Sequence, residues 1–388
     1  MKTLVNFSFR LLSIVALGSV LLLASCGEDE EEPLPEPVAS FTFTPTDPVA
    51  GEEISFTSGS VDATAFQWSF GDGTTSTEEN PTHTYTNEGS YQVTLSVTGE
   101  GGDSTVTQAV EVLYPQMLYA DGLDLTIYDV TIAASGSLSD SIAEYPLNDR
   151  HFPIAVDASS ETIYYIDNFD GILYSANLDG TNQTVINDDA GFFYPSDIAL
   201  DADGNIYVTD RGDSETGEGA TVYRITGTGT ASTLYDDASG LEVPTALAID
   251  PASGDLYIND VGAVNSGYAA DGIWVGNIDG SALTKEITGG GYSIALGSGN
   301  IYFNDAFVDG NIKVAAISDL SASQEFATLD EGNCYGIEYF NGRVYWSDLG
   351  ANVDGGEGSI KRATAATGGN VTVILDALAD PRGLVVFK

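Results

Sequence analysis

The chain has 388 residues, of which 12 are Lys or Arg and 58 are Asp or Glu, so its formal net charge at pH 7 is -46. This charge repels polyanions at long range, and no Lys and Arg cluster is present to bind a phosphate backbone. We therefore expect no nucleic-acid partner. Some 360 residues beyond the N-terminal apolar segment are enough for two or three domains with packed apolar cores.

The first 25 residues have the composition of an export signal. Lys2 and Arg10 carry positive charge, and the apolar run that follows is shorter than the roughly 20 residues of a membrane-spanning helix. The run ends in Leu23-Ala24-Ser25-Cys26, which resembles the lipobox of bacterial lipoproteins. That resemblance implies cleavage before Cys26 and lipidation of its thiol. An ordinary secretory signal with a chance cysteine is the alternative.

Residues 26–36 form an acidic, proline-rich stretch that cannot bury apolar surface. The stretch is similar to the tether of surface-exposed lipoproteins of the Bacteroidetes type. The resemblance implies an outer-membrane protein exposed at the cell surface, which touches the membrane only through its lipid. Cys334, the other cysteine beyond the signal, then has no disulfide partner.

Residues 37–113 predict a small β-sandwich, because short alternating runs are separated by Gly, Pro and Asp. Trp68-Ser69-Phe70-Gly71-Asp72-Gly73 resembles the W-x-F-G-D-G signature of PKD domains, and two further motifs follow in the family's order, Asn80–Tyr85 and Gly89–Leu95. The resemblance implies a non-catalytic extracellular module that acts as a spacer. We expect Asp72 to accept hydrogen bonds from its own turn, and Asp72 and His83 to be structural.

Residues 114–388 contain an internal repeat in which an apolar residue and two variable residues precede an aspartate. The six aspartates are 46, 43, 50, 45 and 43 residues apart, and they are Asp121, Asp167, Asp210, Asp260, Asp305 and Asp348. An all-β period of this length is that of one four-stranded propeller blade.

The two ends of the repeat region complement each other. The first repeat begins at its second strand with Met117, and the chain ends with an isolated first strand, Leu384–Phe387. Pairing the two predicts six blades closed by the C-terminal strand, which removes the exposed edges that an open sheet would present. The repeat resembles the YWTD propellers of the low-density-lipoprotein-receptor class and the neighbouring NHL propellers. The predicted fold is therefore all-β, a PKD-type sandwich followed by a six-bladed propeller.

A binding site is expected at one mouth of the propeller channel. Aligning the repeats places Phe152, Tyr292, Tyr335 and Arg382 at one ring position, together with Ser196 and Thr245, and puts Asp197 at the next. A long loop brings Tyr268 to the same face. The candidate ligand-binding residues are Phe152, Asp197, Tyr292, Tyr335, Arg382 and Tyr268. This aromatic ring, with one acid and one arginine, suits a neutral sugar or a peptide.

No nucleophile elbow, zinc signature or phosphate loop is present, and Cys334 has no evident base beside it. The sequence thus favours a monomeric, non-catalytic surface protein that binds a glycan or a protein. The alternative is a calcium-dependent hydrolase or lyase, because gluconolactonase and strictosidine-synthase propellers have a similar blade pattern. Those families hold calcium with acidic and asparagine ligands at this mouth, where only Asp197 matches. Three or more converging oxygens would favour that alternative.

Overall fold

The computed structural model describes residues 34–46, 48–121, 126–132, 153–167, 171–306, 310–329, 334–350, 357–365, 368, 371–378 and 380–387. The predicted signal, Cys26 and Phe152 therefore lie outside the described residues. Strands dominate the described part, with one 3-10 helix, η1 (Asp237–Ser239). A membrane-crossing helix, which would have to be long and apolar, is not found in the described ranges.

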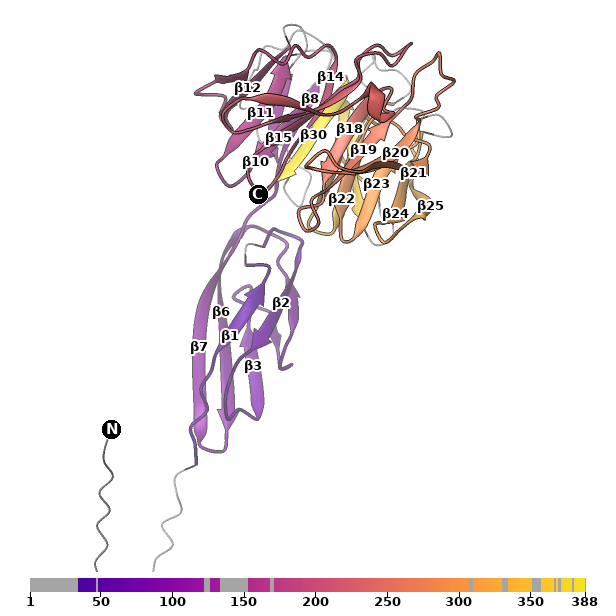
Figure 1. Ribbon diagram of the computed structural model, residues 1–388. Helices are drawn as coiled ribbons and strands as arrows, with labels where there is room; N and C mark the ends of the chain where they lie inside the picture. Colours follow the sequence, from indigo (N-terminus) through magenta and orange to yellow (C-terminus); the bar gives the residue numbers. More distant parts are fainter. Residues whose placement is uncertain are drawn as a thin grey trace, which may run out of the picture.

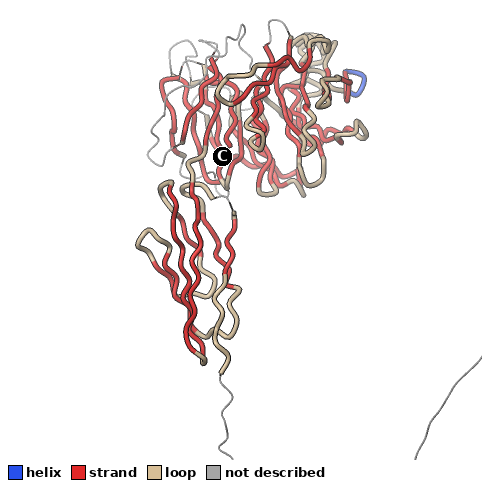
Figure 2. The backbone as a smooth tube through the Cα atoms, turned by 90° about the vertical axis from the view of Figure 1, so that its left-hand side faces the viewer, coloured by secondary structure: helices blue, strands red, loops and turns tan. Residues whose placement is uncertain are grey.

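The N-terminal unit is a sandwich of two antiparallel sheets (Figure 2). One sheet has the order β1-β2-β5 and comprises β1 (Phe41–Thr44), β2 (Glu53–Ser58) and β5 (Thr82–Thr84). The other has the order β4-β3-β6-β7 and comprises β4 (Thr75–Ser76), β3 (Ala65–Ser69), β6 (Gly89–Gly99) and β7 (Gly102–Val112). Inward residues alternate with outward ones, so the apolar faces meet between the sheets.

Trp68 is the centre of the sandwich core and is fully buried. Its ring lies 5.1 Å from that of Phe41 and 5.6 Å from that of Phe56 (centroid distances), and its indole N–H donates to the Glu78 carbonyl at 2.9 Å. Asp72 accepts the Thr74 amide at 2.9 Å and contacts Nε2 of His83 at 2.8 Å. The acid is thus used within its own turn, as the sequence indicates.

The C-terminal unit is a ring of blades (Figure 1). Within the described ranges it has five four-stranded sheets and one three-stranded sheet, each in simple antiparallel order except where the chain ends meet. The four-stranded sheets are β10 (Ile154–Asp157), β11 (Thr162–Asp167), β12 (Ile172–Asn177), β13 (Thr184–Asn187); β14 (Pro195–Leu200), β15 (Ile206–Asp210), β16 (Thr221–Ile225), β17 (Ala231–Asp236); β18 (Pro244–Ile249), β19 (Asp255–Asp260), β20 (Gly272–Asn277), β21 (Leu283–Thr288); β22 (Ile294–Gly297), β23 (Asn300–Asn304), β24 (Ile312–Ala316), β25 (Asp319–Ala327); and β26 (Ile337–Phe340), β27 (Arg343–Asp348), β28 (Gly358–Thr364), β29 (Thr372–Leu378).

The remaining sheet joins the two ends of the propeller, in the order β30 (Pro381–Phe387), β8 (Gln116–Asp121), β9 (Thr126–Thr131). Leu384 pairs with Tyr119, and Phe387 with Gln116. The first strands of neighbouring blades touch all the way round, from β10 through β14, β18, β22 and β26 to β30 and back to β10. The predicted six-bladed ring and its closure by the C-terminal strand are confirmed.

The repeated aspartates hold the connections between blades. Asp260 is fully buried and accepts the amides of Glu242, Val243 and Gly262 at 2.8, 3.0 and 2.7 Å. The first two amides belong to the segment that leads from the previous blade into β18. Asp210 binds its own inter-blade segment in the same way, at the amides of Phe193 and Tyr194. Since an unsatisfied buried amide is costly, these carboxylates are parts of the scaffold.

A turn of the sandwich rests on the propeller. Arg343, at the start of β27, donates from its guanidinium to the Gly51 carbonyl at 3.0 Å, and the Asn341 side chain donates to Glu52 at 3.3 Å. A Cβ added to Gly51, whose φ is +83°, would lie 2.8 Å from the Arg343 guanidinium. The turn therefore requires glycine both for its backbone conformation and for the close approach of Arg343.

Candidate functional site

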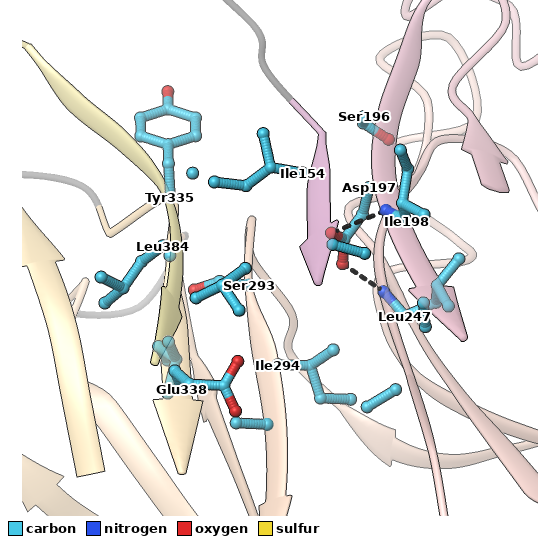
Figure 3. A pocket seen from close by; sticks show the side chains of 18 of the residues that line it. Ile154, Ser196, Asp197, Ile198, Leu247, Ser293, Ile294, Tyr335, Glu338 and Leu384 are labelled. Atoms are coloured by element: carbon cyan, nitrogen blue, oxygen red, sulfur yellow. Dashed lines mark hydrogen bonds between the residues drawn. The ribbon is translucent and has the colours of Figure 1, made fainter. Parts of the chain in front are cut away.

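A cavity of about 310 Å³ runs along the propeller axis and is lined by the first strand of every blade. Its walls are mainly apolar residues of β10, β14, β18, β22, β26 and β30, such as Ile198, Leu247 and Ile294 (Figure 3). Nine of its 26 lining residues have polar, charged or tyrosine side chains, and most of these belong to two levels of the cavity described below. This is the composition expected of a small-molecule site, in which a few polar groups fix the orientation of a ligand.

One end of the cavity carries a stack of an arginine and two tyrosines. The Arg382 guanidinium lies 4.6 Å from the centre of the Tyr335 ring, and that ring stacks on Tyr292 with centroids 4.7 Å apart and an interplanar angle of 28°. Asp380 holds Arg382 in place, because Nε donates to both of its carboxylate oxygens at 2.9 Å. We call Tyr292, Tyr335 and Arg382 the tyrosine–arginine platform.

Burial is the main cause that raises the pKa of Tyr292, and the neighbouring Tyr335 adds to it. Tyr268 lies close enough to contribute to the same shift, but it stands outside the cavity wall and its side chain is exposed. The structure thus brings together three of the predicted aromatic and basic residues, with Tyr268 at their edge. Phe152 lies outside the described residues.

The hydroxyls at the same ring position serve the scaffold. The Ser196 hydroxyl donates to the Pro244 carbonyl at 3.0 Å, and the Thr245 hydroxyl donates to the Gly291 carbonyl at 2.5 Å. Each of these hydrogen bonds joins the first strand of one blade to the chain where it enters the next blade. These two side chains line the cavity but are committed to joining blades, so they are poor candidates for ligand contacts.

Two carboxylates face the cavity deeper down. Asp197, on β14, accepts the amides of Leu247 and Ile198, both at 2.9 Å. Glu338, on β26, accepts the Tyr339 amide at 3.1 Å. Figure 3 shows both carboxylates directed into the cavity from different walls. β14 and β26 are three places apart in the ring of six first strands, which places them opposite each other.

Both carboxylates hold their protons far more tightly than usual. Burial raises the pKa of Asp197 to about 7, although the Leu247 and Ile198 amides work in the opposite direction. Burial raises the pKa of Glu338 to about 8, and the negative charge of Asp197 adds to that shift. Perturbed acids in a cavity are typical of functional sites, because a scaffold gains nothing from them.

The sequence interpretation missed Glu338 and Arg211. The repeat pattern predicts apolar first strands, since these lie nearest the propeller axis, and Glu338 departs from this pattern in β26. Its repeat equivalents are alanine or valine, so the blade alignment already held the signal. Arg211 lines the cavity, close enough to Tyr292 of the platform to oppose the rise in its pKa that burial causes.

Cys334 lies beside the platform but is fully buried, with its sulfur 3.4 Å from the Ser293 hydroxyl. Burial raises the pKa of this thiol, which keeps it un-ionised and a weak nucleophile. Among the described residues, no group of three or more His, Cys, Asp or Glu side chains is arranged to hold a metal ion. The geometry therefore offers π-stacking, cationic hydrogen-bond donors and a pair of proton-binding acids.

Comparison with known proteins supports the assignment of the sandwich. Residues 32–113 match the family model of the PKD domain. The chain is 47% identical over 68 residues to a microbial collagenase of Vibrio alginolyticus, and 51% identical over 55 residues to the pre-pro-metalloprotease PrtV of Vibrio cholerae. These matches cover 16% and 14% of this chain, and only 8% and 6% of the two relatives.

For the propeller, residues 192–215 match the family model of the NHL repeat. A chain of the crystal structure of a nidogen/laminin complex superposes with a TM-score of 0.57 at 15% identity, covering 71% of this chain and 98% of that one. TolB from Acinetobacter baumannii superposes with a TM-score of 0.54 at 9% identity, covering 77% of this chain and 80% of that one. Likenesses at this identity show the fold alone. The protein is thus an all-β chain in which a PKD domain precedes a six-bladed β-propeller.

Proposed function

We propose that this protein is a cell-surface lipoprotein whose propeller binds a glycan or a peptide at the tyrosine–arginine platform, with the PKD domain as a spacer. The observation that supports binding is the platform itself, which lies at one end of an axial cavity. Stacked aromatic rings bind sugar faces and peptide side chains, and a held guanidinium recognises carbonyl or carboxylate oxygens. No covalent chemistry is required of these groups.

The binding proposal is tested by screening the purified full chain on glycan and peptide arrays, followed by titration of any ligand found. Tyr335→Ala and Arg382→Ala should each weaken binding by about tenfold or more, since each removes a stacking or hydrogen-bonding partner. Tyr114→Ala and Arg362→Ala, which change the same residue types away from the cavity, serve as controls. Unchanged affinity in both platform variants would overturn the proposal.

The calcium-dependent alternative is tested in the same screen. If calcium holds the ligand, a chelator should abolish binding, and added calcium should restore it. Asp197, which lies deeper in the cavity, would then be a calcium ligand, and Asp197→Asn should abolish the calcium-dependent binding. Binding that a chelator does not change favours the platform alone.

The anchor proposal depends on Cys26. If this thiol carries lipid, cells that express the chain should incorporate radiolabelled palmitate into it and retain it in the outer-membrane fraction. Cys26→Ser should abolish the label and release the protein into soluble fractions, whereas Cys334→Ser should change neither. A label that persists in Cys26→Ser would contradict lipidation at this site.

A further inference from the structure

The two carboxylates in the cavity are not needed by the propeller fold. Residues equivalent to Glu338 in the other first strands are small or apolar, namely Ala155, Ala199, Ala248, Ala295 and Val385. Residues equivalent to Asp197 carry no charge either, namely Pro153, Ala246, Ser293, Gly336 and Gly383. Five blades thus form without an acid at each position. The two acids therefore occur in two opposite blades that line the same cavity.

Glu338 in particular is incompletely satisfied. Within the described part of the chain its Oε1 accepts the Tyr339 amide, and Oε2 has no hydrogen-bond partner. A partly buried carboxyl group that accepts one hydrogen bond is less well satisfied than the same group in water. Since it faces a cavity rather than packed side chains, a ligand can supply the missing donors.

We propose that the cavity takes a primary ammonium group of the ligand, held between Asp197 and Glu338, while the rest of the ligand stacks on the tyrosine–arginine platform. This inference rests on the proposed binding function and names the ligand class for it. An ammonium group brings three N–H donors and a positive charge, which suit the carboxylate oxygens that Asp197 and Glu338 direct into the cavity. A cavity of about 310 Å³ also has room for a short alkyl stem.

The other charged groups around the cavity define the rest of the ligand. The titratable side chains that line it are Asp197, Arg211, Tyr292, Tyr335, Glu338 and Arg382. Two guanidinium groups at the mouth disfavour a second cation there, so polyamines fit poorly. The fitting ligand has its amine at the two acids deep in the cavity. The rest of the ligand, an aromatic, sugar or peptide part that is neutral or acidic, lies at the platform.

Ammonium binding must also release protons. At pH 7 Glu338 is mostly protonated and Asp197 is about half protonated, because burial raises the pKa of Glu338 to about 8 and that of Asp197 to about 7. A bound cation favours the ionised form of both. The released proton goes to the buffer, so the heat of binding depends on the ionisation enthalpy of that buffer.

The test uses tyramine as the probe and 4-ethylphenol as its match without the ammonium. Isothermal titration of the full chain at pH 7 in phosphate and in Tris gives affinity and proton release together. Tyramine should bind about tenfold or more tightly than 4-ethylphenol, with net proton release. Glu338→Gln, which preserves the side-chain shape, should reduce both the preference and the proton release. Glu111→Gln, on the sandwich, is the control.

Each other outcome overturns the inference. If tyramine and 4-ethylphenol bind equally well to the wild type and neither binds to Tyr335→Ala, the ammonium site is refuted and the platform proposal stands. A tyramine preference that survives in the Asp197→Asn, Glu338→Gln double variant would place the amine elsewhere. No binding of either probe at about 10 mM would refute the ammonium site, while the array screen would still decide on the platform.

Discussion

At the scale of single residues, the molecule uses its acids in two contrasting ways. Asp260 and Asp210 are buried but saturated by main-chain amides, so they stabilise the joints between blades. Asp197 and Glu338 line the cavity and are only partly buried, and Glu338 has a single amide partner. The scaffold acids are thus fully buried and bonded to main-chain amides, whereas the two acids of the candidate site are only partly buried and border the cavity.

Glu338 makes stability depend on pH. Its ordinary pKa is 4.5, and in the folded chain it is raised to about 8. Between these values the folded chain holds a proton that the unfolded chain has lost, so the free energy of unfolding decreases as pH rises through this window. Glu338→Gln lacks this dependence. The melting temperature of the variant minus that of the wild type should increase from about pH 4.5 to about pH 8 and stay level above.

Thermal unfolding followed by circular dichroism at several pH values measures this difference. Glu325→Gln, on the outer strand β25, is the matched control and should show no comparable trend. A temperature difference that is constant across the window would show that Glu338 ionises normally in the folded chain.

At the scale of elements, closure depends on β30. It covers β8 on the side opposite β9, and its Leu384 and Val386 side chains are buried. A chain that ends at Asp380 would leave β8 as an open edge and expose Met117 and Tyr119, which β30 now helps to cover. Loss of this strand should remove several kcal/mol of apolar burial and make the propeller aggregate.

Calorimetry and size-exclusion chromatography of the truncated chain measure this effect. The propeller transition should shift to lower temperature or broaden, while the transition of the PKD domain stays in place. A chain that lacks only Lys388 is the control. An unchanged propeller transition would mean that the ring is stable without its last strand.

Elements were easier to predict than the site, for a physical reason. Each blade repeats the same strand pattern, so six copies of one signal supported the architecture, and the unpaired ends at Met117 and Leu384 indicated closure. Site residues have one copy each. The repeat alignment predicts Tyr335 and Arg382, because they share one ring position. It does not predict Glu338, because only the closed ring determines that this side chain of β26 points into the cavity.

At the scale of the whole molecule, the contact between the domains rests on few bonds. Arg343 reaches the Gly51 carbonyl, and Asn341 reaches Glu52. Arg343→Ala should cost about 1 kcal/mol at this contact and allow the PKD domain to swing about residues 113–115. Small-angle X-ray scattering should then give a larger radius of gyration or a broader distance distribution than in the wild type. Arg362→Ala is the control. Identical scattering curves would show that other contacts fix the two domains.

The position of β8 determines how the propeller resists force. The chain enters the ring through this strand, directly after the PKD domain, and β8 is the middle strand of its sheet, bonded to β9 on one side and β30 on the other. Tension applied from the N-terminal side therefore loads two rows of hydrogen bonds at once and pulls a strand from between its neighbours. An outermost strand is bonded on one side only. A pull on the propeller through the PKD domain is thus resisted by two neighbouring strands, β9 and β30.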